Sequence, residues 1–93
     1  MLDHVFSPFT IKGKTLKNRL AVAAMVTNFS NEDGTCSETF AAYHEARAKG
    51  GYGMIITEDF AVNPRGRGFR CLPGLWNDDQ IAGYKEFTKR IHQ

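Results

Sequence analysis

The sequence has few cysteines and no long hydrophobic run, and each absence excludes a class of protein. Cys36 and Cys71 are the only two cysteines among 93 residues, and they form no Cys-x-x-Cys pair. A zinc knuckle or a redox dithiol therefore has no support. The longest apolar stretches are 20–26 and 54–56, and both are far shorter than the roughly 18 residues that cross a bilayer.

An export signal, a strong net charge and a metal-binding pattern are also missing. The chain opens Met-Leu-Asp-His, which lacks the basic and apolar segments of a signal peptide. We therefore expect a cytoplasmic protein with two reduced thiols. Twelve Lys and Arg against 10 acidic residues do not indicate a nucleic-acid or membrane partner. His4, His44 and His92 share no ligand spacing, so no metal is expected.

Three segments have the patterns of β-strands. Residues 9–16 alternate around a Lys-Gly pair, which predicts a hairpin with Gly13 at positive φ. Residues 20–26 and 53–57 are continuous apolar runs too short for good helices. Such runs are typical of strands buried on both faces of a parallel sheet.

Two segments have the boundary signals of helices. Ser37 is an expected N-cap, and Gly50 with Gly51 provides a left-handed stop. A second helix begins after Asn77 or Asp78. Its expected apolar face carries Ile81, Tyr84, Phe87 and Ile91.

The order of these elements is hairpin, strand, helix, strand, loop and helix. This alternation predicts an α/β fold with a parallel sheet and right-handed crossovers. Residues 1–93 have the size of one domain. Two strands buried on both faces need further neighbours, so we infer that residues 1–93 are the front portion of a larger α/β protein.

One basic cluster leaves two interpretations open. Arg65, Arg67 and Arg70 surround Phe69, and no acidic residue lies between Asp59 and Asp78. Arginines beside an aromatic ring could stack on single-stranded nucleic acid. Alternatively, the segment is a solvated loop whose arginines meet carboxylates of a neighbouring element. The near-neutral net charge favours the second interpretation.

A series of short motifs resembles the start of one enzyme family. The motifs occur in family order in Phe6–Gly13, Leu16–Leu20, Ala23–Met25, Asp33–Gly34, Tyr43, Arg47–Glu58, Leu75–Asp78, Ile81 and Tyr84–Lys85. Together they resemble the N-terminal third of the Old Yellow Enzyme family, the FMN-dependent NAD(P)H:flavin oxidoreductases, including the 2,4-dienoyl-CoA reductases.

The resemblance implies the N-terminal part of a TIM (β/α)₈ barrel, with a capping β-hairpin, two parallel strands and two helices, incomplete as a barrel. Strand one would be Leu20–Ala24 and strand two Met54–Thr57. Barrel active sites lie at the carboxyl ends of the strands, which places 23–27 and 58–61 at the catalytic face.

The resemblance also implies a set of cofactor-binding residues. Ala23, Ala24, Met25 and Val26 match the flavin-binding stretch after strand one, and Asp59 matches a flavin-contacting position after strand two. Without the resemblance, an ordinary alanine-rich buried strand would be the preferred explanation of the first stretch.

Three of these five residues depart from the family pattern. Ala24 stands where the family usually has Pro, Val26 where it has Thr or Cys, and Asp59 where it has a small residue. Valine removes a side-chain donor near the flavin. Asp59 either brings a carboxylate close to the ring or presents only its backbone to it.

The expected function is therefore that of an FMN-dependent NAD(P)H oxidoreductase, which passes a hydride through the flavin to an activated alkene or similar acceptor. The expected partners are a small-molecule substrate and either a second copy of the chain or the rest of the barrel. No catalytic residue is assigned. The rival hypothesis is a non-catalytic α/β module that binds nucleic acid or a protein through Arg65–Arg70.

Overall fold

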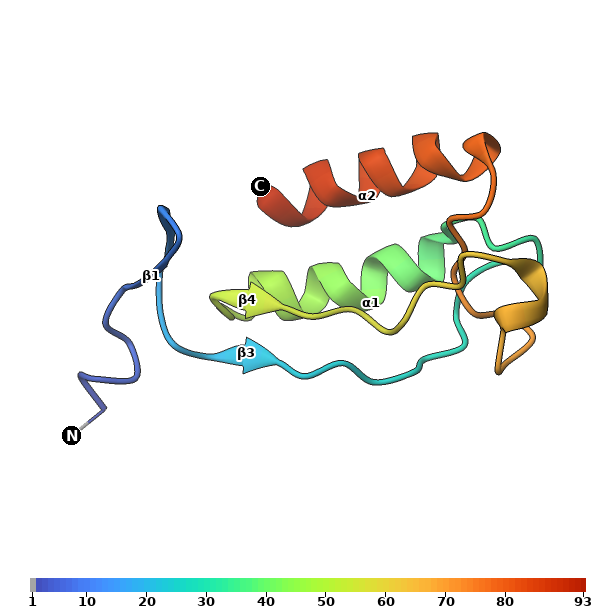
Figure 1. The fold of residues 1–93 in the computed structure, drawn as a ribbon. Helices are drawn as coiled ribbons and strands as arrows, with labels where there is room; N and C mark the ends of the chain where they lie inside the picture. The colour runs from blue at the N-terminus through green and yellow to red at the C-terminus, as the bar shows by residue number, and fades with distance from the viewer. Residues whose placement is uncertain (1) are drawn as a thin grey trace.

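A computed structural model describes residues 2–93, which form two small β-sheets and two helices (Figure 1). The elements are β1 (Phe9–Ile11), β2 (Lys14–Leu16), β3 (Ala21–Val22), α1 (Glu38–Lys49), β4 (Met54–Ile55) and α2 (Ile81–His92). Two short 3₁₀ turns, Pro64–Gly66 and Asp78–Gln80, lie between β4 and α2. The hairpin stands at one end of the molecule and the long loops gather at the other.

The predicted hairpin is confirmed. β1 and β2 are antiparallel, with Phe9 opposite Leu16 and Ile11 opposite Lys14. Lys12 and Gly13 both have positive φ, 47° and 83°. A two-residue turn with two such residues has the twist that antiparallel strands require.

The predicted parallel strand pair is also confirmed, with α1 as its connection. Ala21 pairs with Met54 and Val22 with Ile55. The side chain of Ser37 accepts the Phe40 amide and caps α1. After the helix, Gly51 has φ 105°, a conformation that only glycine adopts without strain. The chain can therefore reverse and enter β4 beside β3.

The expected burial of residues 20–26 on both faces is wrong. Only Ala21 and Val22 form regular strand. Val22 is buried, whereas Ala21 and the segment Ala23–Val26 are exposed. Among the described residues α1 packs against β4 and covers one face of the pair, so side chains on the other face have no layer over them. The expected strand 53–57 is likewise shorter, Met54–Ile55.

Asn18 holds the amino ends of the two parallel strands together. Its side chain is buried and donates to the Gly51 carbonyl at 2.7 Å. Its Oδ1 accepts the Leu20 amide at 3.0 Å and the Gly53 amide at 2.9 Å. The Asn18 side chain thus makes three hydrogen bonds just before the paired residues of β3 and β4.

The core is an aromatic cluster between α1 and α2. Phe40 is fully buried and packs with Tyr84, Phe87 and Phe60. Its ring lies 4.8 Å from that of His44, measured between centroids. His44 is 2% exposed and neither ring nitrogen has a hydrogen-bond partner. Burial lowers the pKa of His44, because the interior disfavours the imidazolium.

The second helix begins later than expected, at Ile81 rather than directly after Asn77 or Asp78, and one residue of its expected apolar face is exposed. Asn77 caps the preceding 3₁₀ turn in a capping box with Gln80. Tyr84 and Phe87 are buried and Ile91 is half-buried, as expected. Ile81 is 53% exposed, because buried Gln80 turns inward beside it and donates to the Asp33 carbonyl.

An ion-pair network joins the two helices at their surface. The Arg90 guanidinium on α2 binds both carboxylate oxygens of Glu38 at 2.8 Å. It also binds both oxygens of Glu45, at 2.8 and 3.1 Å. The planar guanidinium of Arg90 therefore connects two turns of α1 to the end of α2.

Candidate functional site

The candidate site lies where the chain leaves the parallel strands. Residues 23–27 follow β3 and residues 58–61 follow β4, and because the strands are parallel both segments leave the same end of the sheet. In Figure 1 this is the side on which the long loops gather, opposite the hairpin. Open sheets and barrels bind ligands at this end.

The segment after β3 presents an apolar surface with little bulk. Ala23 and Ala24 are exposed, Met25 is 57% exposed and Val26 is 44% exposed. Exposed apolar residues in sequence, rather than singly, indicate a surface that something covers. The structure thus places four of the five expected site residues in one accessible strip.

Asp59, the fifth expected residue, follows β4 at the same end of the sheet and its side chain is exposed. The backbone at Ala61, two residues later, bonds to the Pro73 carbonyl at 2.9 Å and accepts the Leu75 amide at 2.8 Å. The segment after β4 is therefore held from its far side by the chain that leads into α2.

Sequence reasoning missed the side chain that connects the two segments. Glu58 is 2% exposed, and its carboxylate accepts the Thr27 amide at 3.2 Å and the Thr27 hydroxyl. The Asn28 amide donates to the other oxygen at 3.4 Å. The sequence contained one indication of this role. Glu58 is the first acidic residue after the apolar residues 54–56, and a carboxylate buried with them needs hydrogen-bond donors from elsewhere in the chain.

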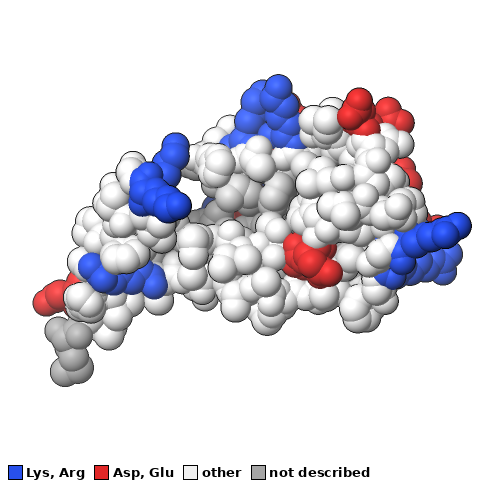
Figure 2. Space-filling model, in the orientation of Figure 1, with Lys and Arg blue, Asp and Glu red and all other residues white. Residues whose placement is uncertain are grey.

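The arginine loop makes contacts within its own chain. Arg70 forms an ion pair with Glu32 at 2.6 Å, as the second interpretation expected. The Arg67 guanidinium lies 5.2 Å from the Trp76 ring centroid and donates to the Glu32 and Arg70 carbonyls. On the face shown in Figure 2, basic side chains form separate groups with acidic ones among them. Nucleic-acid binding through this loop is therefore not supported.

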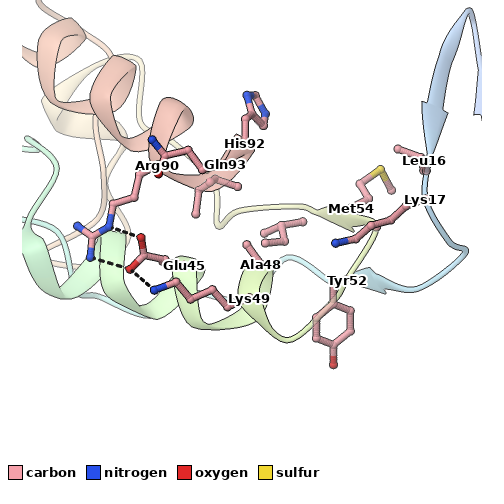
Figure 3. A pocket seen from close by; sticks show the side chains of 13 residues that line it. Leu16, Lys17, Glu45, Ala48, Lys49, Tyr52, Met54, Arg90, His92 and Gln93 are labelled. Carbon is pink, nitrogen blue, oxygen red and sulfur yellow. Dashed lines mark hydrogen bonds and ion pairs between the residues drawn. The ribbon is translucent and has the colours of Figure 1, made fainter.

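A cavity of about 550 Å³ lies at the opposite, amino end of the sheet (Figure 3). It opens between α1, α2 and the start of β4, and Glu45, Lys49, Met54 and Arg90 are among its lining residues. The ion pairs of Glu45 with Arg90 and Lys49 occupy one side of it. This position is remote from the carboxyl ends of the strands, so the cavity is separate from the candidate site.

Within residues 2–93, no group of three or more His, Cys, Asp or Glu side chains is arranged to hold a metal ion. Cys36 and Cys71 are both free and half-buried. No helix in the described part of the chain is long and apolar enough to cross a membrane.

Curated relatives match nearly the whole chain. The NADPH dehydrogenase of Halalkalibacterium halodurans is 40% identical over 93 residues, covering 98% of this chain and 28% of the relative. The NADPH dehydrogenase of Bacillus subtilis is 38% identical over 94 residues, again 28% of its length. The NADH oxidase of Thermoanaerobacter brockii is 37% identical over 90 residues and is covered to 14%. The chain thus spans about a quarter, or less, of these relatives.

Solved structures match in three dimensions as well. A 2-naphthoyl-CoA reductase in complex with 2-naphthoyl-CoA superimposes with a TM-score of 0.95 and 28% identity, over 99% of this chain and 14% of that one. The Old Yellow Enzyme homologue of Zymomonas mobilis gives a TM-score of 0.84 and 30% identity, over 95% of this chain and 24% of that one.

These superpositions show that the hairpin, β3, α1, β4 and α2 have the fold of the N-terminal part of a (β/α)₈ barrel. The expected fold class is confirmed. Residues 4–93 match the family described as NADH:flavin oxidoreductase / NADH oxidase. The chain belongs to the NADH:flavin oxidoreductase / NADH oxidase family.

Proposed function

We propose that this protein is an FMN-dependent NAD(P)H oxidoreductase and that residues 1–93 form the N-terminal part of its barrel domain. The observation that carries the proposal is the exposed strip Ala23–Val26, which, like Asp59, follows a parallel strand at its carboxyl end. A barrel of this family binds its ligands at that end. The substrate is proposed to be a small molecule with an activated alkene or similar acceptor.

The residues of the strip suit a flat isoalloxazine ring. Alanine side chains at 23 and 24 project only a methyl group, so a planar ligand can approach the backbone closely. Met25 and Val26 add an apolar surface, and the polarisable thioether of methionine packs well against rings. The Thr27 hydroxyl is already bonded to Glu58. We therefore infer that backbone amides supply the polar contacts of this strip.

FMN, when bound, would accept a hydride from NAD(P)H and deliver it to the acceptor. The contribution of this part of the chain would be to bind and orient the ring and to keep water from one of its faces. Asp59 keeps its two alternatives: its carboxylate or only its backbone faces the ring. Asp59→Asn separates them, because removal of a facing carboxylate would raise the flavin reduction potential and removal of a distant one would leave it unchanged.

The partner of residues 1–93 is proposed to be either the rest of the same barrel or a second copy. β4 pairs with β3 along one edge, and an open strand edge is a template for another strand. The flavin phosphate in such barrels is typically held by loops after strands seven and eight. The isolated segment 1–93 is therefore expected to retain no FMN.

The test compares one substitution at two exposed alanines in the proposed full-length enzyme, because the isolated segment 1–93 is expected to retain no FMN. Ala24→Phe would fill the proposed ring position, whereas Ala42→Phe places the same side chain on the exposed surface of α1. Flavin absorbance, FMN titration and anaerobic reduction by NADPH and NADH are measured for each. We expect bound flavin in the wild type and in Ala42→Phe and a loss of FMN in Ala24→Phe. Equal FMN binding by both variants would contradict the proposed site.

A further inference from the structure

The strip that is proposed to contact the flavin is held at its two ends by different kinds of bond. The last backbone bond between the parallel strands, within residues 2–93, runs from the Ile56 amide to the Val22 carbonyl at 3.0 Å. The next link between the two segments is the Glu58 carboxylate, which receives the Thr27 amide. Residues 23–26 therefore lie between the last backbone hydrogen bond of the parallel strands and the hydrogen bonds of the Glu58 carboxylate. We call these hydrogen bonds of Glu58 with Thr27 and Asn28 the Glu58 clip.

The Glu58 carboxylate is buried, and its hydrogen-bond donors come from the turn at Thr27 and Asn28. A buried carboxylate is stable only when hydrogen bonds replace its water. Glu58 receives the Thr27 amide and hydroxyl on one oxygen and the Asn28 amide on the other. In the described part of the chain no Lys or Arg forms an ion pair with it. The turn after the strip is thus the sole source of these donors.

The same turn is fastened to the loop that follows β4. Asn28 has φ 60°, a left-handed conformation that Asn adopts more readily than most residues. Its Oδ1 accepts the Cys71 amide at 2.8 Å, and the Ser30 amide donates to the Cys71 carbonyl at 3.1 Å. Glu58 and Cys71 therefore fix the far end of the strip from two sides.

We propose that Glu58 is a positioning residue of the flavin site, whose carboxylate holds the Ala23–Val26 strip in place through Thr27 and Asn28. This inference rests on the proposed function. Asn18 supplies three comparable bonds at the amino end of the same strands. Because only the Glu58 end adjoins the strip, loosening the two ends has different consequences: both lower the stability of the strand pair, and only one disturbs the flavin.

The experiment measures the Glu58 hydrogen bonds and the cofactor separately in the proposed full-length enzyme. Amide hydrogen exchange is followed at Thr27 and Asn28, and FMN affinity and flavin reduction potential are measured by titration. In Glu58→Gln we expect faster exchange at both amides and FMN affinity lower by about tenfold, as for the loss of a hydrogen bond to a charged group. The potential should rise, because a buried anion near the ring disfavours its electron-rich reduced form.

Four further variants show whether the effect belongs to the Glu58 hydrogen bonds. Glu86→Gln makes the same change at an exposed ion pair on α2 and should alter none of these quantities. Asn18→Ala should lower the unfolding temperature and leave FMN affinity within about twofold of the wild type. Thr27→Val should weaken FMN binding, and Thr27→Ser, which restores the hydroxyl, should recover it.

The outcomes separate this inference from the proposed function. If the wild type binds FMN and Glu58→Gln binds it equally well, the positioning role is wrong and the proposed function stands. The role is also wrong if Asn18→Ala weakens FMN binding as much as Glu58→Gln, because the effect is then general loosening of the sheet. If the wild type binds no FMN, the proposed function fails and this inference fails with it.

Discussion

Replacing Tyr84 by phenylalanine should cost the protein a defined amount of stability, because the Tyr84 hydroxyl joins the core to the loop behind the candidate site. The hydroxyl donates to the Gly34 carbonyl at 2.8 Å and lies 3.3 Å from the Ser30 hydroxyl. Tyr84 is 7% exposed and Ser30 4% exposed. Tyr84→Phe therefore removes the hydroxyl and leaves a buried serine without this partner.

The size of this loss of stability depends on which polar groups keep a hydrogen-bond partner in Tyr84→Phe. The Gly34 carbonyl still accepts the Gly74 amide at 3.0 Å, so it is not left unpaired. The cost is one buried hydrogen bond and one under-satisfied hydroxyl, about 1–2 kcal/mol in the free energy of unfolding. Tyr52→Phe is the matched control: Tyr52 is 40% exposed, and we expect a change below about 0.5 kcal/mol.

The raised pKa of Tyr84 also predicts how the free energy of unfolding depends on pH. Burial raises the pKa of Tyr84 from 10.0 to about 12, so between these values the unfolded chain loses its phenol proton while the folded chain keeps it. Stability that is present below pH 10 is therefore lost as the pH rises towards 12. Each unit of pKa difference corresponds to about 1.4 kcal/mol, which makes the total loss roughly 2–3 kcal/mol.

Urea unfolding at neutral pH and through the alkaline range measures both effects. The stability advantage of the wild type over Tyr84→Phe should be present at neutral pH and should vanish or reverse through the alkaline range, because only the wild type has this phenol. All other side chains are the same in the two proteins, so their contributions cancel in the difference. Equal stability of Tyr84→Phe and Tyr52→Phe, with a difference that does not vary with pH, would refute the reasoning.

Three other predictions concern the site, the helix pair and the core. Val26→Thr should raise the flavin reduction potential in a spectroelectrochemical titration, because a hydroxyl can donate to the reduced ring; an unchanged or lower potential would mean that position 26 does not face the flavin. Arg90→Lys should lower the unfolding temperature at low salt and less at high salt, since it breaks the fork to Glu38 and Glu45; equal shifts at both salt concentrations would contradict an ionic role. Burial holds the pKa of His44 below 6.5, so stability should fall as the pH drops below that value; His44→Phe should lack this loss in acid unfolding, and an unchanged acid transition would assign it to other groups.

Local signals in the sequence were sufficient for the hairpin, for the start of α1 and for the cap of the 3₁₀ turn that leads into α2. Lys12 and Gly13 form the turn through their own positive φ, and the side chains of Ser37 and Asn77 accept backbone amides two or three residues later in the chain. Capping and turn formation depend on neighbours in the chain. The motifs in family order also predicted the fold class, which the solved structures confirm, and the site at the carboxyl ends of the strands stays a prediction.

The tertiary structure decided which side chains are buried and which segments are tied together. Glu58 meets Thr27 across 31 positions of sequence, and Ile81 is exposed because Gln80 turns inward to the distant Asp33 carbonyl. The strip after β3 is exposed rather than buried because, among residues 2–93, α1 packs against one face of the strand pair and the strip lies outside that contact. The sequence shows which polar side chains need a hydrogen-bond partner when they are buried. It does not show which distant segment provides that partner, because the fold decides which segments come together.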